Sequence, residues 1–490
     1  MKRLEPGQVL DGFVVQACIH AGSMAHIYSV TAENTPTGPG EGVFPLVMKV
    51  PRMTAGDGAE NLIGFEVEQQ ILPALSGPHV PRFVASGDLA AVPYLVMERI
   101  EGQTLDAWLE DGRGLSATDV AHLGQLLAQA VHQLHLQHVC HLDLKPSNVV
   151  IRMANHPPDR AERAVLLDFG LSHHAHYPDL LAEEMRKAVG SAAWMSPEQV
   201  VGVRGDPRSD VFAIGVVLYQ LATGHLPFGS PVTAGGLRQR LWMDPTPPKS
   251  HNPDVPDWLQ EVVLRCLAPE AEARYPSAAH LAFDLTHPQQ VPVTERGRRT
   301  QGIGFWPHFK RWFRAAGKHY SPSPLPAEQI QSVPIVMVAL PHKDVSDATL
   351  YALRLSTERN LGFRPGARLA VVTVISPSDT NATDEDRSET QVHRLHLARM
   401  QRWAAALDTE GHQLSCHVLE SGDVAHALLQ YARGNHVSII VMGAATHGLS
   451  LQNLVATVPI KVAMHAPCTV TLVKGSLPFS ALGDPELPAF

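Results

Sequence analysis

Two short stretches decide how this chain is interpreted: HLDLKPSN at residues 141–148 and DFG at residues 168–170. A long helical pattern precedes the first stretch, because apolar residues from Leu123 to Leu134 recur at intervals of three and four. The second stretch ends the apolar run VLL, which is typical of a strand. Together the two stretches supply two aspartates, an asparagine and a lysine whose chemistry can be compared with known reactions.

Phosphoryl transfer from ATP requires three kinds of group. It needs a carboxylate beside the attacking hydroxyl, ligands that hold magnesium on the phosphates, and a cation that neutralises the developing charge. Asp143 can act as the base and Lys145 can reach the transferred phosphoryl group, which makes these two the predicted catalytic residues. Asn148 and Asp168 carry the hard oxygen atoms that magnesium prefers. The sequence therefore predicts ATP and Mg²⁺ as cofactors.

A lysine on an apolar strand is the next feature. Lys49 lies in VMKV, residues 47–50, where a desolvated ammonium group is costly unless it is paired. Glu68, in the helical stretch FEVEQQIL, is the expected partner.

With these residues in view, the first 285 residues resemble a bacterial eukaryotic-type serine/threonine protein kinase. Further motifs follow in the order that the family has: LVME at residues 95–98, SPE at residues 196–198, then Asp210 and Arg274. The resemblance implies that Glu198 pairs with Arg274 and that Asp210 braces the catalytic loop.

The resemblance also implies a bilobal kinase fold. Residues 1–100 are expected to form an α+β small lobe with an antiparallel sheet, and residues 101–285 a mainly helical large lobe. The helix register of the family favours Glu68 over the alternative, Glu66, as the partner of Lys49.

The resemblance further places the nucleotide between the two lobes, with Lys49 and Glu68 orienting its phosphates. The other residues expected to bind it are Ile19, Gly22, Ile27, Met97 and Glu98. The phosphate-covering loop reads HAGSMA at residues 20–25 and keeps only one of the usual glycines, so backbone contact with the phosphates is expected to be weakened.

The segment between Asp168 and Glu198 departs from the family pattern in its phosphorylation chemistry. Leu142 stands where most members carry the arginine that clamps a phosphorylated segment. Ser191 replaces a threonine that contacts the catalytic aspartate and lysine, and it retains the hydroxyl. The segment contains no threonine, and its only other hydroxyls belong to Ser172, Tyr177 and Ser196. We therefore expect activity that does not depend on phosphorylation of this segment.

Residues 286–330 have the composition of a linker that contains a basic and aromatic stretch. Between residues 295 and 318 there are seven Lys or Arg and one acidic residue. Aromatic and basic side chains alternate there, as they do in helices that lie on membrane surfaces. Contact of residues 302–320 with a membrane surface is one hypothesis, and packing of the aromatics against a neighbouring domain is favoured over it. Nucleic-acid binding is the weakest of the three because the basic patch is short.

From residue 331 to residue 477 the sequence alternates apolar strands and amphipathic helices, which predicts an α/β domain with a parallel sheet. PIVMVAL at residues 334–340, IIVMGA at residues 439–444 and HAPC at residues 465–468 resemble the universal stress protein family. Residues 478–490 form a tail.

ATP-binding members of that family carry glycines that wrap the phosphates. The matching positions here are Gly443, Thr446, Ala456 and Thr457, and Pro341-His342 stands where an aspartate is common. We therefore expect a domain that does not bind ATP in the usual way and that serves in dimerisation or in receiving a signal. The resemblance implies a homodimer formed through the last strand, residues 469–473.

The composition supports a modular globular protein. Its 490 residues suggest about three domains, and 44% hydrophobic residues are enough to build cores. A net charge of −9 argues against nucleic acid as a partner of the whole chain. The five cysteines are scattered, no secretory leader is evident, and the longest apolar run is too short to span a bilayer. A cytoplasmic location, with the linker at the membrane periphery as an option, is expected.

Two functions of different classes follow. The first is a serine/threonine kinase that uses Mg-ATP, acts on an unidentified protein substrate and is regulated by its C-terminal domain. The alternative is a pseudokinase that binds nucleotide and acts as a signalling scaffold. Histidine clusters at residues 135–141 and 173–176 are more consistent with loop and helix-end positions than with a metal site.

Overall fold

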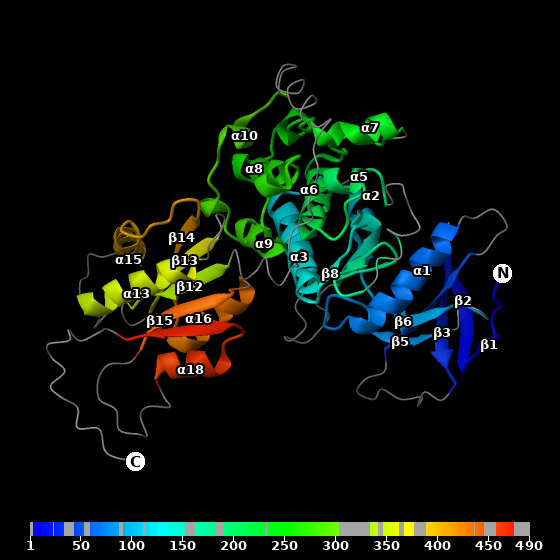
Figure 1. Ribbon diagram of the computed structural model, residues 1–490, viewed down its shortest axis with the longest axis horizontal. Coiled ribbons are helices and arrows are strands. Elements are labelled where there is room, and N and C mark those ends of the chain that lie inside the picture. The colour runs from blue at the N-terminus through cyan, green and yellow to red at the C-terminus, as the bar shows by residue number, and fades with distance from the viewer. Residues whose placement is uncertain are drawn as a thin grey trace, which may run out of the picture. The chain divides into compact units, whose positions relative to one another are not determined.

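We analysed a computed structural model of the chain (Figure 1). It describes residues 3–22, 24–33, 44–52, 59–87, 92–110, 114–152, 162–177, 179, 181, 190–231, 233–302, 334–341, 346–361, 367–376, 389–435, 437–444 and 457–474. The chain divides into two compact units, Met1–Ala327 and Glu328–Phe490, and each is described by itself.

The first unit begins with a six-stranded antiparallel sheet in the order β1-β2-β3-β4-β6-β5. Its strands are β1 (Val9–Leu10), β2 (Phe13–Ala21), β3 (Ala25–Ala32), β4 (Leu46–Pro51), β5 (Phe83–Ser86) and β6 (Leu95–Glu98). Helix α1 (Ala59–Ile71) and the 3-10 turn η1 (Leu72–Ala74) follow β4. The predicted antiparallel sheet of the small lobe is confirmed.

Alternation along β4 directs its side chains to two different cores. Met48 and Val50 join Val15, Tyr28 and Val96 in a cluster on one face of the sheet. Val47 lies on the opposite face, in the cluster that includes α1 residues and the large lobe. Because side chains two apart share a face of a strand, Lys49 is on the same side as Val47 and faces α1.

The large lobe is built around α3 (Ala117–Leu136), which packs against α6 (Pro207–Thr223) and α9 (Ala278–Thr286). Ser116 caps α3 in a capping box, in which its hydroxyl accepts the Asp119 N–H and the Asp119 carboxylate accepts the Ser116 N–H. The other helices in the described part of this lobe are α2 (Leu105–Glu110), α5 (Pro197–Val200), α7 (Ala234–Arg238), α8 (Asp257–Cys266) and α10 (Glu295–Arg298).

Short paired strands flank the loops of the large lobe. β9 (Val149–Arg152) lies between β10 (Arg163–Leu166) and β7 (Gln103–Thr104), and β8 (Val139–Cys140) pairs with β11 (His173–His174). Five 3-10 turns complete the lobe: η2 (Pro146–Asn148), η3 (Gln239–Leu241), η4 (Pro248–Ser250), η5 (Ala271–Ala273) and η6 (Pro288–Gln290). Residues 141–148 therefore lie between two short paired strands.

The chain stays folded on the large lobe beyond the expected start of the linker at residue 286. Gln260 of α8 donates to the carbonyl oxygens of Gly297 and Arg299 at 3.1 and 2.7 Å. The Glu261 carboxylate accepts the N–H groups of Thr294 and Gly297 at 3.0 and 2.8 Å. Two buried polar side chains thus satisfy the backbone of residues 294–299, which apolar periodicity alone does not indicate.

The second unit contains a parallel five-stranded sheet in the order β14-β13-β12-β15-β16, as predicted. Its strands are β12 (Ile335–Ala339), β13 (Arg368–Ile375), β14 (Gln413–Glu420), β15 (Ile439–Gly443) and β16 (Thr469–Val473). The helices described in it are α13 (Asp347–Asn360), α15 (Glu389–Ala404), α16 (Val424–Gly434) and α18 (Val458–His465).

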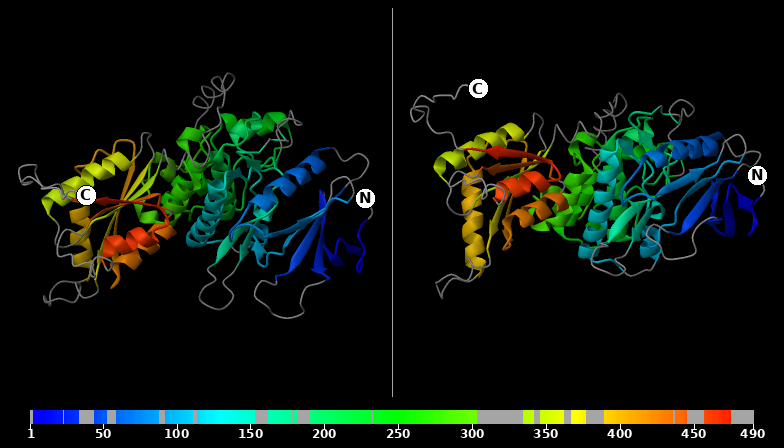
Figure 2. Two further views of the ribbon diagram at one scale, coloured as in Figure 1. Left: turned by 60° about the horizontal axis from the view of Figure 1, so that its bottom comes forward. Right: turned by 90° about the horizontal axis from the view of Figure 1, so that it is seen from below.

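Helices cover both faces of this sheet (Figure 2). Leu369 and Val371 of β13 belong to a cluster with Leu353 of α13 and Trp403 of α15. The alternate residues Ala370 and Val372 are equally buried on the other face, where α16 contacts β13. This is why β13 is an unbroken apolar run rather than an alternating one.

Several predicted features lie outside the described residues. They are residues 303–320 of the basic and aromatic stretch and the tail, residues 478–490. Within the part of the chain that is described, no helix combines the length and the apolar character needed to cross a membrane.

Candidate active site

Lys49 joins three separate elements of the first unit. Its Nζ lies 2.5 Å from Glu68 Oε2 on α1 and 2.8 Å from Asp168 Oδ1 after β10. Glu68 is 1% exposed, and its second oxygen accepts the backbone N–H of Phe169 at 3.3 Å. The predicted Lys49–Glu68 pair is confirmed, and Glu66 is not buried.

The charges of this cluster influence one another. Burial acts to lower the pKa of Lys49, but the carboxylates of Asp168 and Glu68 outweigh it and raise that pKa. Lys49 lowers the pKa of Asp168 to about 2. Burial raises the pKa of Glu68, against the attraction of Lys49. Asp168 therefore remains ionised at any physiological pH.

Asp143 is held by three groups from two segments. Its Oδ1 accepts the Ser191 N–H at 2.8 Å, and its Oδ2 accepts Lys145 Nζ at 2.8 Å. Lys145 also donates to the Ser191 hydroxyl at 2.9 Å, so the serine keeps the contact expected at that position. Asn148 Nδ2 donates to the Asp143 carbonyl at 3.0 Å. The carboxylate is 8% exposed and its orientation is set on both oxygens.

Asp210 of α6 braces the loop of residues 141–148, as predicted. Its two carboxylate oxygens accept the N–H groups of His141 and Leu142 at 2.8 Å each. Leu142 has φ +62°, a left-handed conformation that is costly for a residue with a branched side chain. Two charge-assisted hydrogen bonds hold this turn in place, and the turn directs Asp143 toward Ser191.

Asn148 and Asp168 offer a donor set that fits magnesium. The Asn148 amide nitrogen donates to the Asp143 carbonyl, which leaves the Asn148 amide oxygen as an acceptor. The Asp168 side chain is 39% exposed, and one of its oxygens bonds Lys49. An ionised carboxylate and an amide oxygen are the hard ligands that Mg²⁺ takes beside phosphate oxygens.

The predicted nucleotide contacts lie on the small-lobe sheet. The turn between β2 and β3 is closed by the Gly22 N–H, which donates to Ala25 O at 3.0 Å. Ile19 is 44% exposed, whereas Ile27 is packed against the apolar cluster that α1 shares with the large lobe. Ser23, in the same turn, lies outside the described residues.

Met97 and Glu98 end β6. Met97 is 8% exposed and belongs to the apolar cluster that α1 shares with the large lobe. The Glu98 carboxylate accepts both terminal nitrogens of Arg152 at 3.2 Å and lies 3.7 Å from Arg82 Nε. The side chain of Glu98 is thus committed to two arginines, so any contact of this residue with a nucleotide has to come from its backbone.

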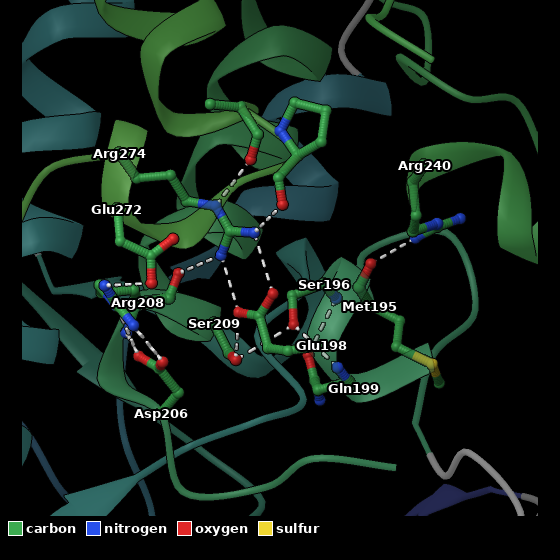
Figure 3. Close-up of polar contacts among 12 residues, drawn as sticks. Met195, Ser196, Glu198, Gln199, Asp206, Arg208, Ser209, Arg240, Glu272 and Arg274 are labelled. Atoms are coloured by element: carbon green, nitrogen blue, oxygen red, sulfur yellow. Dashed lines mark hydrogen bonds and ion pairs between the residues drawn. The ribbon is translucent and has the colours of Figure 1, made fainter. Parts of the chain in front are cut away.

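The segment after Ser191 is anchored by two buried arginines (Figure 3). Glu198 and Arg274 form the predicted pair, with N–O distances of 2.7 and 2.9 Å. Arg240, which is 0% exposed, donates to the carbonyl oxygen of Met195. Burial lowers the pKa of Arg240 to about 10, so the guanidinium is charged at neutral pH.

Several contacts of the site were not anticipated from the sequence. These are the Lys49–Asp168 pair, the anchoring by Arg240, and an ion pair between Arg204 and Asp179. Arg204 precedes GDPRSD and Arg240 ends GGLRQR, and neither arginine carries a periodic or motif signal in the sequence. The position of Arg204 shortly after SPE is the only hint that the sequence contains.

A buried His, Cys and Asp group lies behind the loop. Of the described residues, only His135, Cys140 and Asp210 bring three metal-binding side-chain atoms within 4.8 Å of one another. The Asp210 carboxylate is already used by two backbone N–H groups and by His135 Nε2 at 2.8 Å. Burial raises the pKa of the Cys140 thiol. His135 and Asp210 therefore form a hydrogen-bond network that supports residues 141–148, and the Cys140 thiol donates to Gly205 O instead.

In the second unit, four positions match the phosphate-wrapping glycines of ATP-binding family members, and two of them lie in the described part. Gly443 ends β15 and Thr457 precedes α18. Thr446, Ala456 and His342 lie outside the described residues, so the expected loss of usual ATP binding stays a prediction.

Comparison with known proteins agrees with this geometry. The family model described as the protein kinase domain matches residues 47–284, and that of the universal stress protein family matches residues 335–474. The serine/threonine-protein kinase Pkn1 of Myxococcus xanthus is 35% identical over 258 residues, which are 52% of this chain and 34% of Pkn1. PknB of Mycolicibacterium smegmatis is 30% identical over 253 residues, which are 50% of this chain and 39% of PknB.

The chain therefore spans little more than a third of the length of either of these two relatives. Among solved structures, a point mutant of the PknI kinase domain of Mycobacterium tuberculosis is 21% identical. The match has a TM-score of 0.44 and covers 59% of this chain and 100% of that domain.

Proposed function

Because this chain consists of a protein kinase domain of the bacterial Hanks type followed by a universal stress protein domain, we propose that it is a serine/threonine protein kinase that uses Mg-ATP. The observation that carries the proposal is the triple contact of Lys49, which joins the small-lobe sheet, α1 and the segment that begins at Asp168. A lysine held in this way can present its charge to phosphates between the lobes.

Asp143 is proposed as the group that receives the proton of the attacking hydroxyl. Both of its oxygens are already oriented by Ser191, Lys145 and Asn148, so the carboxylate does not have to reorganise when a substrate arrives. Lys145, which bridges Asp143 and Ser191, lies where it can neutralise charge on the transferred group. A substrate serine or threonine then places its hydroxyl beside Asp143.

Asn148 and Asp168 are proposed to hold the metal, and Lys49 with Glu68 to orient the phosphates. Bound Mg²⁺ would neutralise phosphate charge and align the γ-phosphate for transfer. Ile19, Gly22, Ile27, Met97 and the backbone of Glu98 are proposed to form the remaining nucleotide contacts. The Gly22 N–H is used inside its own turn, which supports a weakened phosphate loop.

The kinase is further proposed to act without phosphorylation of the segment between Asp168 and Glu198. Leu142 beside the catalytic aspartate provides no cation for a phosphate. Ser191 of this segment donates its N–H to Asp143 and accepts Lys145 Nζ, so the segment contacts both proposed catalytic residues through its own serine, which supports this proposal.

The second unit is proposed to regulate the kinase as a dimerisation or signal-receiving domain. Strand β16 is at the edge of the sheet and pairs with β15, and Leu472 on it is 44% exposed. An edge strand with an exposed apolar residue is suited to pairing with a second copy. Contact of residues 302–320 with a membrane surface remains a separate hypothesis for a stretch that lies almost wholly outside the described residues.

A pseudokinase that acts as a nucleotide-dependent scaffold is the second candidate, because the phosphate-covering loop keeps only one of the usual glycines and the Gly22 N–H is already bonded to Ala25 O. Incubation of the purified protein with Mg²⁺ and labelled ATP, alone and with a generic basic protein, separates the two functions. We expect phosphoserine or phosphothreonine in the product. The rate of phosphate transfer should fall by at least about a thousandfold in Asp143→Asn.

Asp254→Asn, which changes an exposed aspartate of the same lobe, is the matched control and should keep wild-type transfer. Absence of transfer in the wild type, together with a rise in thermal stability when ATP is added, would favour the scaffold.

A further inference from the structure

The segment between Asp168 and Glu198 is held by an ion pair that the proposed chemistry does not use. Arg204, in the loop before α6, donates its Nε to Asp179 Oδ2 at 2.8 Å. Its Nη2 donates to Leu171 O at 2.9 Å and Ser172 O at 3.4 Å. One guanidinium therefore holds both the start of the segment and a carboxylate seven residues further along.

The pair is sheltered from solvent. The side chains of Arg204 and Asp179 are 12% and 18% exposed, and His173 Nε2 lies 4.0 Å from the same carboxylate oxygen. Charge-assisted hydrogen bonds that are partly withdrawn from water are stronger than those of exposed ion pairs. This pair can therefore hold Leu171, Ser172 and Asp179 together.

The residue that follows Arg204 packs against a strand pair that leads into residues 141–148. The next residue, Gly205, has φ +80°, and a Cβ there would lie 2.9 Å from the His173 ring. His173 belongs to β11, whose partner β8 leads directly into residues 141–148. On the other side, Asp210 holds the backbone of that loop from α6. Arg204 thus connects Asp179 to the structure that positions Asp143.

The segment has no free serine or threonine that could take a regulatory phosphate. Its only serines are Ser172, Ser191 and Ser196, and it contains no threonine. Ser172 is 2% exposed and bonds His141 O, Ser191 bonds Lys145, and Ser196 is 0% exposed. Tyr177 is 39% exposed and stacks on His174 with ring centroids 3.9 Å apart.

We propose that the Asp179–Arg204 ion pair holds this segment permanently in its catalytic position, so that Asp179 provides the anionic anchor that a phosphoryl group provides when a segment is switched. A phosphate acts in such a place by giving an arginine a charged acceptor, and a carboxylate supplies the same acceptor without modification. Asp179 and Arg204 are positioning residues, and the inference rests on the proposed kinase function.

The test compares variants of the full chain after phosphatase treatment, with the turnover rate and the KM for ATP measured separately. Asp179→Asn and Arg204→Gln should each lower kcat by about tenfold while KM for ATP changes less than about twofold, since the nucleotide contacts are elsewhere. Asp179→Glu, which keeps the charge, should retain most of kcat. The exchange Asp179→Arg with Arg204→Asp should recover part of the loss, and Asp254→Asn is the neutral control.

Hydrogen exchange of residues 171–177 gives a readout that does not depend on turnover. Faster exchange there in Asp179→Asn, with unchanged exchange in α3, is expected. If the wild type transfers phosphate and Asp179→Asn does so at the same kcat, the inference is overturned and the kinase function stands. If the wild type and Asp143→Asn are equally inactive, the kinase function fails, and the inference fails with it.

Discussion

Arg274 uses all five of its N–H donors in the interior of the first unit. It donates to the two oxygens of Glu198 and to the carbonyl oxygens of Ala268, Arg208 and Pro269, at distances from 2.7 to 3.2 Å. Glu198 also accepts the Ser209 hydroxyl at 2.7 Å. Burial acts to raise the pKa of Glu198, but Arg274 outweighs it and lowers that pKa. The pair is therefore charged and fully hydrogen-bonded.

Breaking this pair leaves an uncompensated buried charge. We expect Glu198→Gln to lower the free energy of unfolding by about 3 to 5 kcal/mol, because the Arg274 guanidinium stays buried without a counter-charge. Denaturant unfolding of the chain measures it. The double variant Glu198→Leu with Arg274→Met should cost less than the sum of its two single variants, and simple additivity would contradict the argument.

At the scale of elements, α6 and α8 approach one another closely at Gly215. A Cβ at this position would lie 2.5 Å from Cys266 Cβ and 3.2 Å from Leu267 Cδ2. The helix therefore contains glycine where its own propensity would favour alanine. α6 is buried along almost its whole length, and Asp210 lies in its first turn.

Gly215→Ala should destabilise the first unit by about 1 to 3 kcal/mol, since overpacking outweighs the gain in helix propensity. The matched control is Gly235→Ala in α7, where the nearest atom to a Cβ is Thr233 Oγ1 at 4.0 Å. The control should be neutral or slightly stabilising. Thermal unfolding of both variants distinguishes them, and equal melting temperatures would rule out the close contact as the cause.

At the scale of the whole molecule, partly buried histidines make the first unit sensitive to acid. Burial is the largest cause that lowers the pKa of His79, His173 and His174, and the neighbouring His176 and His138 lower that of His174 further. An unfolded histidine has its pKa near 6.5, so below that pH the unfolded chain binds protons that the folded chain does not. The contribution of these histidines to stability is fully present above pH 6.5 and is lost as the pH falls below it.

Acidification from pH 7.5 to pH 5.5 should therefore lower the melting temperature, because in this range the unfolded histidines take up protons more readily than the folded ones do. His174→Gln should reduce this pH dependence, because one proton-linked group is removed. His225→Gln, at an exposed position of the same lobe, is the control. If acidification lowers the melting temperature of His174→Gln as much as that of the wild type, His174 is not one of the acid-sensitive groups.

The sequence by itself determined the features whose physics is local. Periodicity defined α3 and the parallel strands of the second unit, and the Ser116 capping box marks where α3 begins. Ordered motifs predicted the pairs Lys49–Glu68 and Glu198–Arg274, both of which the structure contains.

Only the tertiary structure decided which distant groups share a partner. Lys49 also bonds Asp168, Arg204 bonds Asp179, and Gln260 with Glu261 keeps residues 294–299 on the large lobe. An isolated arginine or glutamine has no spacing that reveals its partner, because its side chain is long and its hydrogen bonds depend on which backbone groups packing brings near. Such contacts are fixed when apolar surfaces associate and leave polar groups that have to be satisfied.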